Sequence, residues 1–187
     1  MNYVLGSTRG GNSKFTEALD ELAAIPGFQN VQKVLVVADN DLDPAAAFND
    51  IAAAISATAP IIGPPASRYI PPGAPLTKAG ANPAIIVMMI PWTGMAGSLS
   101  TMCLAAAANA APAIAVCVNA LATCTAADKW PLTTLAKMKL RALIASAHRA
   151  KPELSPAYVW SEGTNLVPLT DGVFDQVATF LSGFPAF

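Results

Sequence analysis

Two segments with runs of consecutive apolar residues constrain the fold of this 187-residue chain more than any other feature. Residues 31–38 contain the run VLVVA, and residues 84–90 read AIIVMMI. Consecutive rather than alternating apolar residues are typical of parallel strands that are buried on both faces. Parallel neighbours need a crossover connection, which is usually a helix. The sequence therefore predicts two core strands of a parallel sheet.

Helical patterns alternate with these strands. Residues 13–24 place their apolar side chains on one stripe, as an amphipathic helix does. Pro44 suits the first turn of a helix that ends near residue 56. A short strand at residues 3–5 precedes both. This alternation predicts an α/β fold with a Rossmann-like, mostly parallel sheet, in a single domain over residues 1–187.

The rest of the chain is expected to be mainly helical. Residues 60–83 are the exception, because their many prolines predict an extended excursion inside the domain. Residues 112–122 fit either a helix or a strand. The clearest helical patterns cover residues 98–109, 135–148 and 173–181.

Composition narrows the partners and the compartment. Only 12% of the residues are charged, compared with about a quarter in ordinary domains, which predicts a surface partly hidden in a homodimer. No segment approaches the roughly 18 apolar residues of a membrane span, so no membrane partner is expected. The N-terminus lacks the regions of a signal peptide. Cys103, Cys117 and Cys124 lack CxxC spacing, so we expect buried free thiols and a cytoplasmic protein.

Three of the twelve acidic residues lie within five positions, directly after the first apolar run. Alternation along an extended chain would send Asp39 and Asp41 to the same side. Open α/β sheets bind their ligands at this end of their strands. Paired carboxylates suit Mg²⁺ or Mn²⁺, which keep several waters and accept one or two carboxylates plus substrate phosphate. A second interpretation stays open, because Asp43 before Pro44 is a good helix N-cap and Asn40 and Asp41 are common turn residues.

The acidic segment belongs to a set of motifs that resembles the uncharacterised bacterial Toprim-like proteins. These are relatives of the Toprim domains in topoisomerases, DnaG-type primases and overcoming-lysogenisation-defect nucleases. The resemblance spans most of the chain from Gly6 onward. It is carried by VVADNDLDP, IVMMIPWTGMAGSLSTMCL, CVNALATCT, DKWP, KMKLRALIAS and VPLTDGVFDQVATFL.

The resemblance implies a Toprim-like core with helical C-terminal additions and Mg²⁺-dependent phosphodiester chemistry on nucleic acid. It implies Asp39 and Asp41 as metal ligands and catalytic residues, with Asp43 beside them. The chain departs from the family pattern in two places. Ser100 stands where the family has a glutamate. The glutamate-bearing first strand is expected to be absent, because it would lie upstream of the glycine loop and the sequence begins at Met1, just before that loop. A degenerate, non-catalytic interaction module is therefore an alternative.

The loop LGSTRGGNSKFTEAL also resembles the first loop of NADPH-dependent flavin reductases, which have a flavodoxin-like fold. Backbone N–H groups at a helix N-terminus form a phosphate-binding site. The resemblance implies that FMN phosphate is held within Gly6–Ser13, by Ser7, Thr8, Arg9 and Ser13. A glycine-rich loop that only turns the chain is the other interpretation.

A basic face is predicted on the helix at residues 135–148. Lys137, Arg141 and His148 share one face of this helix, and Leu140 and Leu143 lie on the other. If the Toprim resemblance holds, Lys137 and Arg141 are expected to contact the phosphate backbone of nucleic acid. A plain solvated face is the alternative. His148 is the only histidine, which excludes zinc sites built from several histidines.

Overall fold

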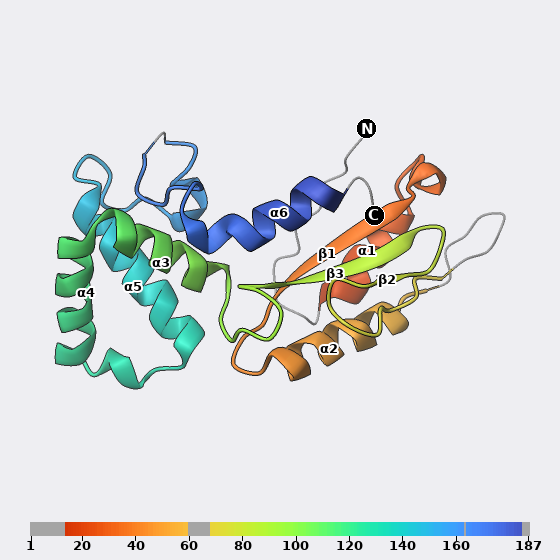
Figure 1. Ribbon diagram of the computed structural model, residues 1–187, viewed down its shortest axis with the longest axis horizontal. Helices are drawn as coiled ribbons and strands as arrows, with labels where there is room; N and C mark the ends of the chain where they lie inside the picture. The colour runs from red at the N-terminus through yellow and green to blue at the C-terminus, as the bar shows by residue number, and fades with distance from the viewer. Residues whose placement is uncertain (1–13, 60–67, 163, 185–187) are drawn as a thin grey trace. The chain divides into compact units, whose positions relative to one another are not determined.

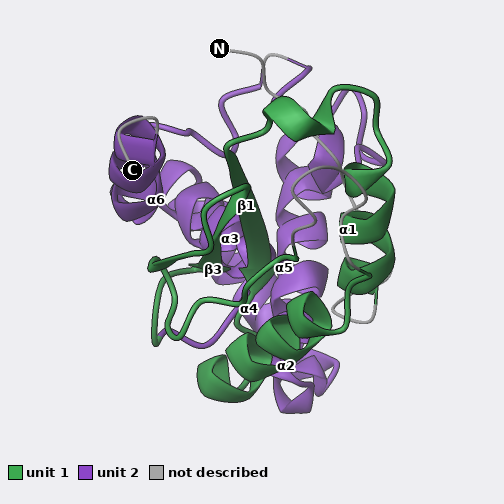
Figure 2. Ribbon diagram, turned by 90° about the vertical axis from the view of Figure 1, so that its right-hand side faces the viewer, with its two compact units in different colours: residues 1–94 green, residues 95–187 purple. Residues whose placement is uncertain are grey.

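The computed structural model describes residues 14–59, 68–162 and 164–184. These residues form a mixed α/β protein in which six α-helices accompany a three-stranded sheet (Figure 1). The chain divides into two compact units, residues 1–94 and 95–187 (Figure 2). The α/β class is therefore confirmed, and the single-domain organisation stays a prediction.

The first unit contains the sheet. Strand β1 (Lys33–Asp39) lies parallel to β3 (Ala84–Ile90) over seven residue pairs. Strand β2 (Lys78–Ala79) pairs antiparallel with the other side of β3. The expected parallel pair is present, and the described sheet is mixed because β2 adds an antiparallel edge. The strand expected at residues 3–5 lies outside the described residues, so the Rossmann-like arrangement stays a prediction.

The two parallel strands differ in burial. Every residue of β3 is buried, which fits its position between two neighbouring strands. Strand β1 alternates instead, and Val37 in its middle keeps 40% of its surface exposed. The expectation that residues 31–38 are buried on both faces was therefore wrong. The apolar run of β1 covers the core with Val34, Val36 and Ala38 only.

Two helices cover one face of this sheet. Helix α1 (Phe15–Ala23) and helix α2 (Pro44–Ser56) match the predicted ranges to within two residues. Thr16 Oγ1 donates a hydrogen bond to the Ala54 carbonyl at 3.0 Å and links the two helices. Alternate residues of β1 and β3 form one core with both helices and the short turn η2 (Phe28–Asn30). Its buried members are Leu19, Phe28, Val34, Val36, Ala38, Ala47, Phe48, Ile51, Ile55, Tyr69, Ile85, Val87 and Met89.

The proline-rich excursion is anchored on this core by Tyr69. The Tyr69 ring packs edge-on against Phe28, and its hydroxyl donates to the Leu19 carbonyl at 3.1 Å. Burial, together with the negative charge of Asp20, raises the pKa of Tyr69 well above its usual range. The phenol therefore stays protonated and keeps its donor. The described part of the excursion is irregular, with turns and the short strand β2, so the expected extended course stays a prediction.

The second unit is helical. Its long helices are α3 (Leu99–Ala110), α4 (Pro112–Cys124), α5 (Leu132–Ala147) and α6 (Asp175–Gly183), and its short turns are η3 (Ala127–Lys129), η4 (Pro156–Tyr158) and η5 (Gly172–Phe174). Helix α5 packs against both α3 and α4. Residues 112–122, which fitted helix or strand, are helical, with Pro112 in the first turn. No helix in the described parts of the chain has both the length and the apolar character that crossing a bilayer requires.

The three cysteines are free thiols in different surroundings. Cys103 is buried in α3, whereas Cys117 and Cys124 are exposed on α4. The expectation of three buried thiols was therefore wrong for two of them. Helix α4 contains no charged residue, so its sequence gave no sign of which face turns outward. Burial raises the pKa of the Cys103 thiol to about 11.

This difference predicts the reactivity of the thiols. In the native protein, we expect 5,5′-dithiobis(2-nitrobenzoic acid) to modify Cys117 and Cys124 rapidly and Cys103 only after unfolding in guanidinium chloride. The reason is that the thiolate is the nucleophile, and Cys103 is both covered and protonated. The absorbance of the released thionitrobenzoate measures how many thiols react in each phase. Cys103→Ala should leave the number of rapidly reacting thiols unchanged. Equal rates for all three thiols would contradict the assignment.

Candidate functional site

Asp39 ends strand β1 at the carboxyl edge of the parallel pair. Its Cα lies opposite that of Ile90, the last residue of β3, and its side chain is half-buried. The next amide, Asn40 N, donates to the Ile90 carbonyl at 2.8 Å, so the pairing of the two strand ends continues past β1. This position agrees with the prediction for Asp39, because ligands of open α/β sheets bind at this edge.

Asn40 is the residue of this segment that sequence reasoning did not single out. Its side chain is completely buried, and its Nδ2 donates to the Trp92 carbonyl at 2.7 Å. This bond ties the turn after β1 to the turn after β3. Asn40 therefore fixes the backbone between Asp39 and Asp41. Its sequence signal is weak, because asparagine is common in exposed turns as well.

Asp41 is exposed and forms an isolated β-bridge, with a left-handed backbone at a φ of 49°. Aspartate tolerates this conformation better than most residues other than glycine. Since β1 ends at Asp39, the alternation rule of an extended strand does not reach Asp41. The extended backbone that the rule requires is therefore not present at Asp41, and a shared side for the two carboxylates stays a prediction. Asp39 and Asp41 are still adjacent in sequence to Asn40, whose side chain is fixed by its hydrogen bond to Trp92.

Asp43 is the N-cap of helix α2. Its Oδ1 accepts hydrogen bonds from the backbone N–H groups of Ala45 and Ala46, both at 3.0 Å. Caps of this kind stabilise a helix by about 1 kcal/mol. The capping interpretation is confirmed. A metal-binding role for Asp43 stays a prediction, and one of its carboxylate oxygens is already engaged.

Asp39 and Asp41 are the metal ligands that the sequence predicts at this edge. Within the described ranges, no group of three or more His, Cys, Asp or Glu side chains could hold a metal ion. Mg²⁺ does not need such a group, because it keeps several waters and uses one or two carboxylates plus phosphate. A two-carboxylate site of Asp39 and Asp41 for Mg²⁺ or Mn²⁺ stays a prediction.

Ser100, which stands at the glutamate position of the Toprim-like pattern, lies in the first turn of α3 and is half-buried. The helix begins with a capping box, in which Thr101 Oγ1 accepts from the Ser98 backbone N–H at 3.1 Å. Ser100 has no carboxylate, so it cannot take the acid–base role of a glutamate. The flavin residues Ser7, Thr8, Arg9 and Ser13 lie outside the described residues, and the FMN site stays a prediction.

Helix α5 carries the predicted basic face. Lys137 and Arg141 are exposed one turn apart, while Leu140 and Leu143 are buried against the rest of the unit. His148 differs from the prediction, because α5 ends at Ala147 and His148 caps it outside the helix. The solvated positions of Lys137 and Arg141 leave both cations available to phosphate. Contact with nucleic acid stays a prediction.

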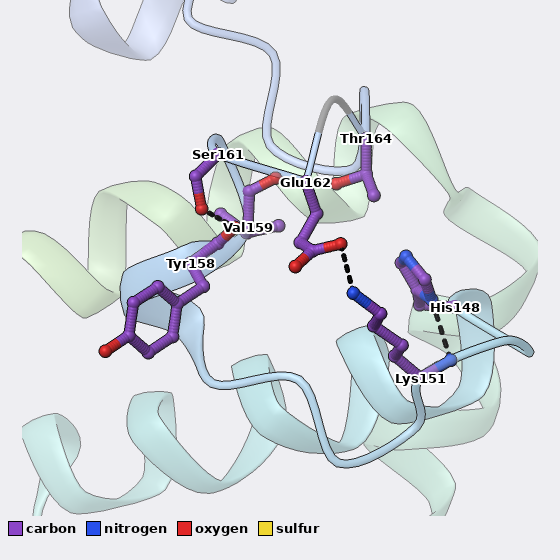
Figure 3. A network of polar contacts seen from close by, with 7 residues as sticks. All are labelled: His148, Lys151, Tyr158, Val159, Ser161, Glu162 and Thr164. Atoms are coloured by element: carbon purple, nitrogen blue, oxygen red, sulfur yellow. Dashed lines mark hydrogen bonds and ion pairs between the residues drawn. The ribbon is translucent and has the colours of Figure 1, made fainter.

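A polar network holds the chain after α5 (Figure 3). His148 Nδ1 accepts a hydrogen bond from the Lys151 backbone N–H at 3.0 Å. The Lys151 ammonium pairs with the Glu162 carboxylate at 2.5 Å. The hydrogen bond and the positive charge of Lys151 hold the pKa of Glu162 below its usual range. The network therefore joins the segment around residue 151 to the segment around residue 162.

This network predicts a pKa change. Lys151→Met is expected to raise the pKa of Glu162 toward the ordinary glutamate range, because the variant loses the ammonium donor. A lowered pKa in the folded state stabilises the protein above the unfolded-state pKa, and that contribution is lost as the pH falls through the folded-state pKa. The variant should therefore lose less stability on acidification. An NMR titration of the Glu162 carboxyl carbon measures the shift, and an unchanged midpoint would contradict the pairing.

Comparison of the chain with protein-family models, with curated proteins and with solved structures finds no match. The Toprim-like and flavin-reductase resemblances therefore stay predictions that rest on their motifs. The described geometry places Asp39 at a strand edge of the first unit and two exposed cations, Lys137 and Arg141, on α5 of the second.

Proposed function

We propose that this chain is a Toprim-like protein that binds nucleic-acid phosphodiesters in a Mg²⁺-dependent way. The observation that carries the proposal is the position of Asp39, which ends a strand at the carboxyl edge of a parallel pair. Edges of this kind are where open α/β sheets bind ligands. The spacing of Asp39 and Asp41 agrees with the Asp-x-Asp pattern of the family that the chain resembles.

In this proposal the chain's residues position and neutralise phosphate. Asp39 and Asp41 would hold the ion, and Asn40 fixes the backbone between them. A bound Mg²⁺ would supply charge stabilisation for a phosphodiester at this edge. Lys137 and Arg141 contribute separate, salt-dependent contacts to the phosphate backbone. Because Ser100 offers no carboxylate for proton transfer, binding is expected to exceed cleavage.

Binding of a labelled oligonucleotide tests the proposal. By fluorescence anisotropy, the wild type is expected to bind more tightly in Mg²⁺ than in EDTA, and Asp39→Asn is expected to lose that difference. Lys137→Glu/Arg141→Glu should weaken binding in both buffers and reduce the salt slope, since each phosphate contact contributes about 0.9 to a slope on double-stranded DNA.

The matched control is Asp50→Asn, which removes an exposed carboxylate from α2 in the same unit. It should behave as the wild type in both buffers. Equal binding by wild type and Asp39→Asn in Mg²⁺ would contradict a role for the strand edge. Gel electrophoresis of the same samples shows whether the protein also cleaves the oligonucleotide.

A further inference from the structure

The second unit contains a groove that shares only Arg141 with the predicted sites. Its volume is about 470 Å³, which lies within the roughly 300–1,000 Å³ range of small-molecule sites. One wall is the last half of α5, and the other is the segment that follows it. The lining residues are Arg141, Ala142, Ala145, Pro152, Glu153, Leu154, Ser155 and Pro156.

The wall at residues 152–156 is held at both ends. At one end, Lys151 is fixed by the His148 imidazole and by the Glu162 carboxylate (Figure 3). The Leu154 N–H donates to the Lys151 carbonyl at 3.0 Å. At the other end, Ser155 begins η4 as its N-cap. The groove is therefore largely formed before any ligand arrives, which lowers the entropic cost of binding.

The groove lining contains one positive and one negative side chain, Arg141 and Glu153, on different walls. Arg141 is exposed, and within the described part of the chain it takes part in no ion pair. An unpaired guanidinium presents a planar fork of donors that matches phosphate oxygens. Glu153 is the only acidic lining residue and stands on the opposite wall. It would repel additional phosphates and accept hydrogen bonds from sugar hydroxyls or base amino groups.

The rest of the lining is apolar. Ala142 and Ala145 on α5 face a wall with Pro152, Leu154 and Pro156, so the groove offers a surface for a flat, weakly polar ring. A phosphate with an attached planar group satisfies both parts of this lining. Inorganic phosphate would use only Arg141, and an uncharged ring would use only the apolar wall.

We propose that this groove binds a nucleoside monophosphate unit, with its phosphate on Arg141 and its base against the apolar wall. The proposal deepens the proposed function, because the unit would be one nucleotide of a bound strand or a free nucleotide. It does not depend on Asp39 or on Mg²⁺. Glu153 makes the groove selective for a monophosphate or a diester over a triphosphate.

Titration calorimetry with AMP, adenosine, inorganic phosphate and ATP on the full chain tests this inference. AMP is expected to bind the wild type more tightly than the other three probes. Arg141→Gln should weaken AMP binding about tenfold, the effect of losing one charge-assisted interaction. Ala145→Met should block it by filling the groove without changing charge. Glu153→Gln should narrow the preference for AMP over ATP.

Two controls keep the outcome clear. Lys129→Gln removes an exposed cation of the same unit outside the groove lining and should leave AMP binding unchanged. NMR shifts of the Ala142 and Ala145 methyl groups locate the ligand in the wild type, without relying on a variant that fails to fold. Tighter binding of a pentanucleotide than of AMP assigns the groove to a strand, and equal binding assigns it to a free nucleotide.

Asp39→Asn should bind AMP as the wild type does, so a failed metal site leaves this result intact. AMP binding that survives Ala145→Met, or phosphate binding as tight as AMP binding, would overturn the inference. So would AMP-induced shifts that leave both methyl groups unmoved.

Discussion

Ile51→Ala is expected to lower the free energy of unfolding by about 3 kcal/mol, within the usual 2–5 kcal/mol for emptying a core position. Ile51 lies in the middle of α2 with 0% of its surface exposed. It belongs to the core that α1 and α2 form with alternate residues of β1 and β3. Removing three carbon atoms there loses burial and leaves a cavity that a packed sheet cannot close.

Ile70→Ala is the matched control, because it makes the same substitution in the same unit at a side chain that is 52% exposed. It should cost well under half as much. Urea unfolding followed by circular dichroism gives both values, and the midpoint should fall for Ile51→Ala with little change in slope. Similar losses for the two variants would contradict the described core.

Local signals made some of these elements predictable. Helix α2 begins and ends at the predicted residues because Asp43 and Pro44 specify its start by capping and by a fixed φ. Strands β1 and β3 were found because apolar runs of this length have few other structures available. These features depend on neighbours in sequence, which a single sequence contains.

Other features depend on partners far along the chain. The exposure of Val37 depends on which elements cover each face of β1. The only local sign was that Val37 shares its face with Lys33 and Asp39, whereas the other face is entirely apolar. Cys117 and Cys124 face outward on a helix without charged residues, so no periodic pattern marked that side. The packing of α4 against α5 determines which side of α4 is buried.

The candidate site divides in the same way. The sequence predicted Asp39 at a strand end and Asp43 as a cap, because both follow from adjacent residues. It could not predict the left-handed backbone at Asp41 or the burial of Asn40. The Asn40 side chain donates to the Trp92 carbonyl, which lies fifty-two residues away in the sequence. The residue that fixes this segment, Asn40, is therefore an uncharged one that the search for metal ligands did not consider.

Replacing either aspartate of the strand edge is expected to have the largest effect on metal binding. Asp39 and Asp41 would supply all of the protein ligands in the proposed two-carboxylate site. Changes even in the outer shell of a metal site cost about 10- to 100-fold in affinity, so the loss of a direct ligand should cost at least as much. Asp43→Asn should have a smaller effect, because Asp43 already caps α2.

Isothermal titration of the full chain with Mg²⁺ and with Mn²⁺ tests the central claim most directly. The account predicts weak, saturable binding by the wild type and by Asp50→Asn, and its loss in Asp39→Asn and in Asp41→Asn. Circular dichroism of each variant establishes that the fold is retained. Absence of binding in the wild type, or equal binding in all four proteins, would contradict a metal site at the strand edge.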